Sequence, residues 1–243
     1  MAKGKGIVQL TGTLQGFTFY LLDGKQVVRT AGGGFNGEAI KTKASMARVR
    51  ENSSEFKNCM QTVASFKQML QPYLQLLKDG KLHQRLVRVF TQLKAFDITS
   101  TRGQRIVAKG LATAHGRDLL RGYVLTQDGS LQSMLQQAYI FDEQNGLQVP
   151  HFNTTPLFTN TIADQMELFL RYILIDANGE FSFVQSEKLV IDHNFSGDVA
   201  LAVPILPDYN CCVVVAIGRF FQEINGNFYP LSKGVMEVVE VMG

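Results

Sequence analysis

Apolar and polar positions alternate through the first thirty residues, in the stretch GIVQLTGTLQGFTFYLLDGKQVVRT. A period of two is typical of β-strands, and Asp23-Gly24 is a favoured two-residue turn between antiparallel strands. The pattern therefore predicts an N-terminal β-hairpin, followed by a glycine-rich loop that ends at Gly37. Phe17, Phe19 and Tyr20 are expected to pack in a core, although exposed aromatics could stack on bases.

The period then changes to three and four residues, which indicates amphipathic helices. The apolar positions of the first are Met46, Val49, Phe56, Met60, Val63, Leu70, Leu74 and Leu77. Pro72 is expected to kink or divide this helix. A second helix is predicted from Leu82 to Phe96, and the short gap favours an antiparallel helical hairpin.

The charged stretch RVRENSSEF, residues 48–56, has two interpretations as a part of the first helix. Asn52 and Glu55 have the spacing of a capping box, which would place the start of the helix at Asn52. Alternatively the helix begins near Ser45, and Arg48 and Glu51 then form an i,i+3 pair.

Beyond Asp97 the sequence predicts strands separated by turns at Asp-Gly and Asn-Gly pairs. The predicted strands are MELFLRYILI, FSFVQSEKLVI, DVALAVPIL, NCCVVVAIGRFF and GVMEVVEVM, and LQSMLQQAY is a short helix candidate. We therefore predict an α+β protein in which the two hairpins precede a mainly antiparallel β-sandwich. The expected domains are a hairpin arm with its hinge at 1–37, a basic helical hairpin at 38–97 and an acidic sandwich at 98–243.

Composition fits a globular protein, since 45% of residues are hydrophobic and 19% are charged. Three cysteines without paired spacing predict a fold without disulfides in a reducing compartment. No signal peptide and no membrane-spanning stretch is evident. We expect the protein in the cytoplasm or in an assembled particle.

Charge divides the chain unevenly. Residues 1–122 contain 20 lysines and arginines against 7 acids, a net charge of +13, whereas residues 123–243 contain 4 against 14, a net charge of −10. Such a division suggests that the basic half meets phosphate or an acidic protein surface, or that the two halves attract each other. Basic helices and acidic strands that merely share out solvated charge are the simpler alternative.

The cations are densest at Lys41, Lys43, Arg48 and Arg50, four in ten residues without an acid between them. Arg85 and Arg88 extend the set. These six residues are the candidate contacts to a partner or to phosphate.

Motifs for catalysis or cofactor binding are weak. Residues 32–37, GGGFNG, match G-x-G-x-x-G but lack the βαβ context of a dinucleotide site, so a hinge is the better interpretation. The four histidines are scattered without metal-ligand spacing. Cys211 and Cys212 read as buried small hydrophobes. We therefore predict no enzyme, cofactor, metal or small-molecule substrate, with an undetected active site as the alternative.

The run GIVQLTGTLQGFTFY, the following VRTAGG and the segment RVRENSSEF resemble an uncharacterised family of proteins from Bacteroidota genomes. In that family a hairpin with the pattern GTLxGxxFY precedes an RxRENxxEF segment. The resemblance covers residues 4–60 closely and the C-terminal half loosely. It implies no activity, cofactor or catalytic residue.

Three functions remain after these exclusions. The first is a non-enzymatic structural or assembly subunit of a phage-derived or other multi-copy particle, a homo-oligomer whose basic half contacts the acidic half of the next copy. The alternative is a nucleic-acid-associated protein whose basic half covers phosphates. An adaptor with a carbohydrate- or protein-binding sandwich is a third reading.

Overall fold

The computed structural model describes residues 2–4, 10–31, 37–76, 79–127, 129–159, 161–176 and 178–243. The chain divides into two compact units, Met1–Arg50 and Glu51–Gly243. The predicted glycine-rich hinge falls mostly on residues 32–36, which lie outside the described residues.

The first unit contains a four-stranded antiparallel sheet with the strand order β1-β4-β3-β2. Its elements are β1 (Ala2–Gly4), β2 (Gly12–Leu14), β3 (Phe17–Leu22), β4 (Lys25–Thr30), α1 (Gly37–Thr42) and the 3₁₀ turn η1 (Ala44–Met46). β3 and β4 are joined at Asp23 and Gly24, whose φ angles of 49° and 72° are both positive. A turn of this kind matches the right-handed twist of the paired strands.

One face of this sheet is apolar. The register places Leu14 opposite Phe17 and Phe19 opposite Val28, and Leu21 lies two residues further along β3. Phe17 is 50% exposed and Leu14 is 62% exposed. The expectation that Phe17 packs in a core is therefore wrong, because among the described residues of this unit only Val27 is buried.

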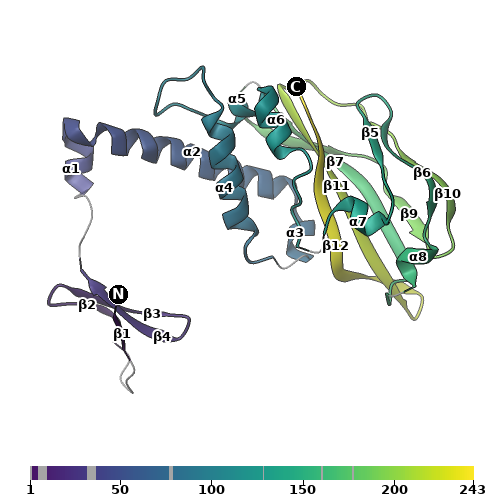
Figure 1. The fold of residues 1–243 in the computed structure, drawn as a ribbon, viewed down its shortest axis with the longest axis horizontal. Coiled ribbons are helices and arrows are strands. Elements are labelled where there is room, and N and C mark those ends of the chain that lie inside the picture. The colour runs from purple at the N-terminus through teal and green to yellow at the C-terminus, as the bar shows by residue number, and fades with distance from the viewer. Residues whose placement is uncertain are drawn as a thin grey trace. The chain divides into compact units, whose positions relative to one another are not determined.

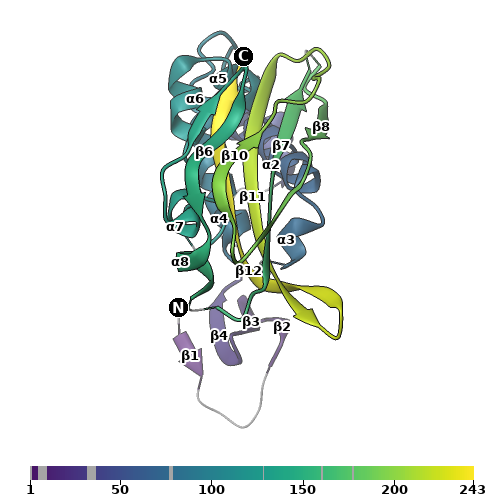
Figure 2. The ribbon, with the colours of Figure 1, turned by 90° about the vertical axis from the view of Figure 1, so that its right-hand side faces the viewer.

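The second unit has three layers, which Figure 1 and Figure 2 show from two sides. Its helices are α2 (Ala47–Met69, which begins in the first unit), α3 (Tyr73–Leu76), α4 (Leu82–Ala95), α5 (Val107–Leu111), α6 (Ala114–Leu120), α7 (Leu131–Leu135) and α8 (Thr155–Phe158). Its strands are β5 (Ile140–Asp142), β6 (Gly146–Asn153), β7 (Gln165–Ile175), β8 (Phe181–Gln185), β9 (Leu189–Asp192), β10 (Ser196–Leu201), β11 (Cys211–Ile224) and β12 (Asn227–Met242).

The central layer is the antiparallel sheet β12-β11-β7-β8, with β9 also paired to β7. Alternate residues of β7 and β11 face opposite layers: Phe169 and Ile173 pack with the helices, whereas Leu170 and Tyr172 pack against the second sheet, β10-β6-β5. Burial on both faces explains the continuous apolar runs of these strands. The protein is thus α+β, with antiparallel sheets.

The helical layer is held together by contacts of high sequence separation. The rings of Phe66 in α2 and Phe90 in α4 lie 5.3 Å apart. The buried Glu55 carboxylate accepts hydrogen bonds of 2.7 Å from the Lys94 ammonium and from the Gly103 amide. α5 approaches α4 so closely that a Cβ added to Gly110 would lie 1.9 Å from the backbone oxygen of α4.

Several local predictions can be compared with these elements. The helix is interrupted around Pro72 as predicted, since α2 ends at Met69 and α3 begins at Tyr73. The capping-box interpretation of Asn52 is wrong, because α2 already begins at Ala47 and Asn52 lies inside it. The predicted strand FSFVQSEKLVI is two strands, because residues 186–188 between β8 and β9 leave the ladder.

Candidate functional site

The structure gives the predicted basic residues of the first unit unequal roles. Arg50 donates hydrogen bonds of 2.5 Å and 2.9 Å from one guanidinium nitrogen to the backbone oxygens of Ile40 and Lys43. Ile40 lies in the last turn of α1 and Lys43 directly follows the helix, where backbone oxygens lack donor partners within the helix. Arg50 is therefore a structural residue, whereas Lys41, Lys43 and Arg48 are exposed.

Arg85 and Arg88, in the second unit, differ in the same way. Arg85 forms an ion pair of 2.6 Å with Asp79 and donates to the backbone oxygens of Val124 and Leu125 at 2.9 Å and 2.8 Å. It ties α4 to the segment after α6. Arg88 is exposed on α4. Four of the six predicted contact residues thus lie on the surface, and two hold the fold.

A second group of cations, which the sequence analysis did not single out, surrounds Tyr73. The guanidinium carbons of Arg171 and Arg219 lie 4.9 Å and 5.3 Å from the Tyr73 ring centre, and the Lys188 nitrogen lies 5.8 Å from it. Glu167 lies 3.2 Å from Lys188 and 3.5 Å from Arg219. Cation–π contacts and one carboxylate therefore balance part of this charge.

Arg171 is the most buried member of this group, with 4% of its surface exposed. It donates to the backbone oxygens of Met69 and Gln71, at 2.7 Å and 2.9 Å, and to the side chain of Gln185 at 2.8 Å. Burial lowers the pKa of Arg171. Because its acceptors lie at the end of α2, Arg171 fastens that helix to the central sheet. The one positive charge in MELFLRYILI was the sequence signal for this role.

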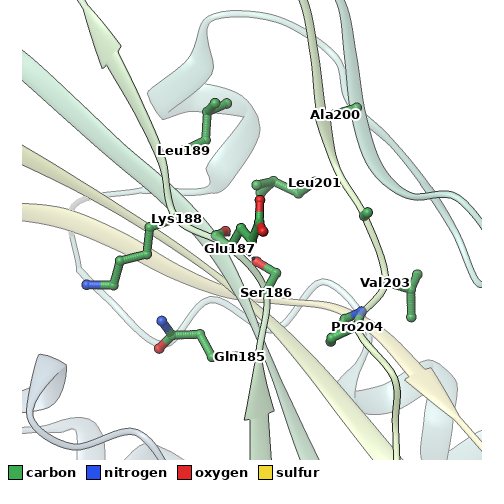
Figure 3. Close-up of a pocket in the computed structure, with 10 residues that line it drawn as sticks. Gln185, Ser186, Glu187, Lys188, Leu189, Ala200, Leu201, Val203 and Pro204 are labelled. Atoms are coloured by element: carbon green, nitrogen blue, oxygen red, sulfur yellow. Dashed lines mark hydrogen bonds between the residues drawn. The ribbon is translucent and has the colours of Figure 1, made fainter.

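A groove of about 410 Å³ opens between the edges of the two sheets. Residues 185–189 form one wall, at the break between β8 and β9, and residues 200–204 form the other, at the end of β10 (Figure 3). Leu189, Leu201, Val203 and Pro204 make most of the lining apolar. Figure 3 shows Glu187 directed between the two walls and Lys188 directed away from them.

The remaining reactive groups do not form a catalytic arrangement in the described part of the chain. No group of three or more metal-ligating side chains occurs there. The three thiols are buried, and burial raises the pKa of Cys211 to about 11. Thiols of this kind are poor nucleophiles at neutral pH.

Comparison with protein-family models, with curated proteins and with solved structures gives no match. Within the ranges that the structure describes, no helix is both long and apolar enough to cross a membrane.

Proposed function

We propose that this chain is a non-enzymatic assembly subunit of a multi-copy particle, phage-derived or of another kind, in the cytoplasm or within the particle itself. In this proposal the N-terminal unit is a hairpin arm. It docks on the acidic C-terminal region of a neighbouring copy, residues 98–243, which acts as a β-sandwich domain. Copies join head to tail.

The observation that carries this proposal is the uncovered apolar face of the first sheet. Leu14 is 62% exposed, Phe17 is 50% exposed and Leu21 is 42% exposed, and all three lie on one face. Small sheets are marginal unless a hydrophobic face is buried, and exposed apolar patches mark interaction surfaces. Burial of this face against a neighbour supplies what the unit itself lacks.

Charge supports the choice of neighbour. Residues 1–50 contain eight lysines and arginines and two acids, whereas the chain from residue 123 onward has a net charge of −10. Opposite charges steer association, whereas the repulsion of like charges disfavours contact between two basic units. Arg50 and Arg85 donate hydrogen bonds to backbone oxygens, whereas Lys41, Lys43, Arg48 and Arg88 are exposed at the surface.

The test is the mass of the full-length protein in solution, measured by size-exclusion chromatography with light scattering. We expect a defined oligomer that weakens as salt rises, because at 0.1 M salt largely screens the interaction of exposed charges that lie more than about 10 Å apart. A variant with Leu14→Glu and Phe17→Glu should be monomeric at concentrations where the wild type assembles. Both residues are exposed, so the substitutions remove no buried packing.

The matched control replaces two exposed isoleucines of the second unit, Ile98→Glu and Ile140→Glu, which are 86% and 59% exposed. This control should assemble like the wild type. A wild-type monomer at all salt concentrations would contradict the proposal. So would an N-terminal variant that assembles normally.

Addition of duplex DNA distinguishes the alternative function, nucleic-acid binding, from assembly. A nucleic-acid-associated protein would co-elute with DNA at low salt, and Lys41→Glu with Lys43→Glu would weaken retention and flatten its salt dependence. Under the assembly proposal, DNA leaves the oligomer mass unchanged.

A further inference from the structure

The groove of the second unit is a discontinuity in its sheet edge. β8 pairs with β7 up to Gln185 opposite Arg171, and β9 resumes with Leu189 opposite Leu168. Four steps along one strand thus oppose three along the other, which is the signature of a β-bulge. Ser186 fixes the bulge, because its amide donates to the Leu170 oxygen and its hydroxyl accepts from the Leu170 amide, both at 2.9 Å.

The bulge sends two neighbouring charges to opposite faces of the sheet. Lys188 lies on the helical side, where Glu167 and the ring of Phe169 receive it at 3.2 Å and 5.2 Å. Glu187 is exposed and lies in the groove (Figure 3). Its carboxylate makes no hydrogen bond or ion pair with the described residues. The groove therefore offers one uncompensated negative charge between apolar walls.

Both walls also end in free strand edges within the described ranges. β8 and β9 pair only with β7, and β10 pairs only with β6. Unpaired strand edges present backbone donors and acceptors that an added strand can satisfy. An extended segment with an apolar side chain and a nearby cation matches the groove better than a compact ligand does.

Charge indicates where such a segment originates. Residues 176–208, which include the groove, contain six acids and one lysine, a net charge of −5. Residues 1–50 have a net charge of +6. In the described part of this N-terminal unit, β2 pairs with β3 alone and so has a free edge, and it carries the exposed Leu14.

We propose that the groove between residues 185–189 and 200–204 receives the β2 edge of a second copy of this chain. Leu14 enters the apolar part, and a cation of the same unit pairs with Glu187. This inference rests on the proposed assembly function and identifies the surface at which assembly occurs.

Disulfide trapping in the full-length protein tests the inference directly. Leu14→Cys and Ala202→Cys, both at exposed positions, are made in separate chains that are then mixed and oxidised with diamide. A disulfide needs the two Cα atoms within about 7 Å of each other. We expect a dimer joined between the two variants, and none when Leu14→Cys is mixed with Glu143→Cys. The native cysteines are buried and give little background.

A charge reversal gives an independent measurement. Glu187→Lys should weaken self-association by about tenfold or more, since it places like charges in contact. Glu143→Lys, at an exposed turn outside the groove, should leave the association constant unchanged.

The outcomes separate this inference from the proposed function. A bond that forms only within one chain, when both cysteines are on the same copy, would overturn the second copy as the occupant. If no bond forms and Glu187→Lys associates normally, while Leu14→Glu with Phe17→Glu still abolishes assembly, the groove is refuted and the assembly function stands. A wild type that never associates refutes both.

Discussion

Asp97 is the residue whose substitution has the best-defined cost. It is 1% exposed and lies just after α4. One carboxylate oxygen accepts from the amides of Thr99 and Ser100, at 3.1 Å and 3.0 Å, and the other accepts from the Ile106 amide at 3.1 Å. The side chain therefore organises the loop between α4 and α5.

The pKa of Asp97 supplies the magnitude. Burial by itself raises this pKa, but hydrogen bonds from Ser100, Ile106 and Thr99 outweigh it and lower the value from 3.8 to about 2. A shift of this size corresponds to about 2.5 kcal/mol of stability at neutral pH. Because the pKa is lowered in the folded state, this stability is present above pH 4 and is lost as the pH falls toward 2.

Asp97→Asn removes the charge and presents an amide nitrogen to one of the backbone donors. We expect a loss of about 2.5 kcal/mol at pH 7, which lowers the melting temperature by about 5–10 °C. At pH 3 the difference from the wild type should shrink to about half. Urea unfolding followed by circular dichroism at both pH values measures it.

Asp208→Asn, at an exposed position, is the control and should change stability by less than about 0.5 kcal/mol. Two results would refute the reasoning about Asp97. One is an Asp97→Asn variant as stable as the wild type at pH 7. The other is a deficit that stays constant from pH 7 to pH 3.

Two further pairs of substitutions test the packing and hydrogen bonding of the second unit. Gly110→Ala should destabilise it by about 3 kcal/mol or more, because the new Cβ would overlap the backbone of α4. Gly80→Ala, the control, has open space around the new Cβ and should be close to neutral. Equal melting temperatures of the two variants would contradict this packing. Tyr172→Phe should be neutral or stabilising by about 1 kcal/mol, because its buried hydroxyl makes no hydrogen bond with the described residues. Tyr139→Phe removes a hydroxyl that donates a hydrogen bond to a carboxylate, so it should cost about 1–2 kcal/mol of stability, measured by urea unfolding. A larger loss of stability in Tyr172→Phe than in Tyr139→Phe would be inconsistent with the structure.

Periodicity was sufficient to place the long elements. The helix predicted from Leu82 to Phe96 is α4, Leu82–Ala95. A helix that packs one side against a core needs apolar residues at three- and four-residue intervals, and this pattern is visible in the sequence alone. The break inside FSFVQSEKLVI could not be predicted in the same way. It depends on Ser186 bonding the backbone of Leu170, a residue of another strand, and that pairing leaves no local pattern.

The candidate contact residues show the same limit. Sequence reveals the positive charges of Arg50 and Arg85, but their acceptors are backbone oxygens, which every residue carries and no pattern distinguishes. Whether Phe17 is buried also depends on which other parts of a protein cover it, and the local sequence pattern does not show this. The uneven distribution of charge can be read from the sequence, whereas the division into surface and structural cations depends on the fold.

Arg171 shows why this division matters for interpreting charge in a protein of this kind. A buried cation without a carboxylate on it would ordinarily be costly. Here the end of α2 supplies two backbone oxygens with partial negative charge, and the rings of Tyr73 and Phe183 lie 4.9 Å and 4.2 Å from the guanidinium carbon. The arginine thus exchanges hydration for fixed acceptors and couples the helical layer to the sheet. Arg171 is unexpected in an apolar strand, but its side chain connects two layers of the fold. It is therefore not one of the charges that a partner could contact.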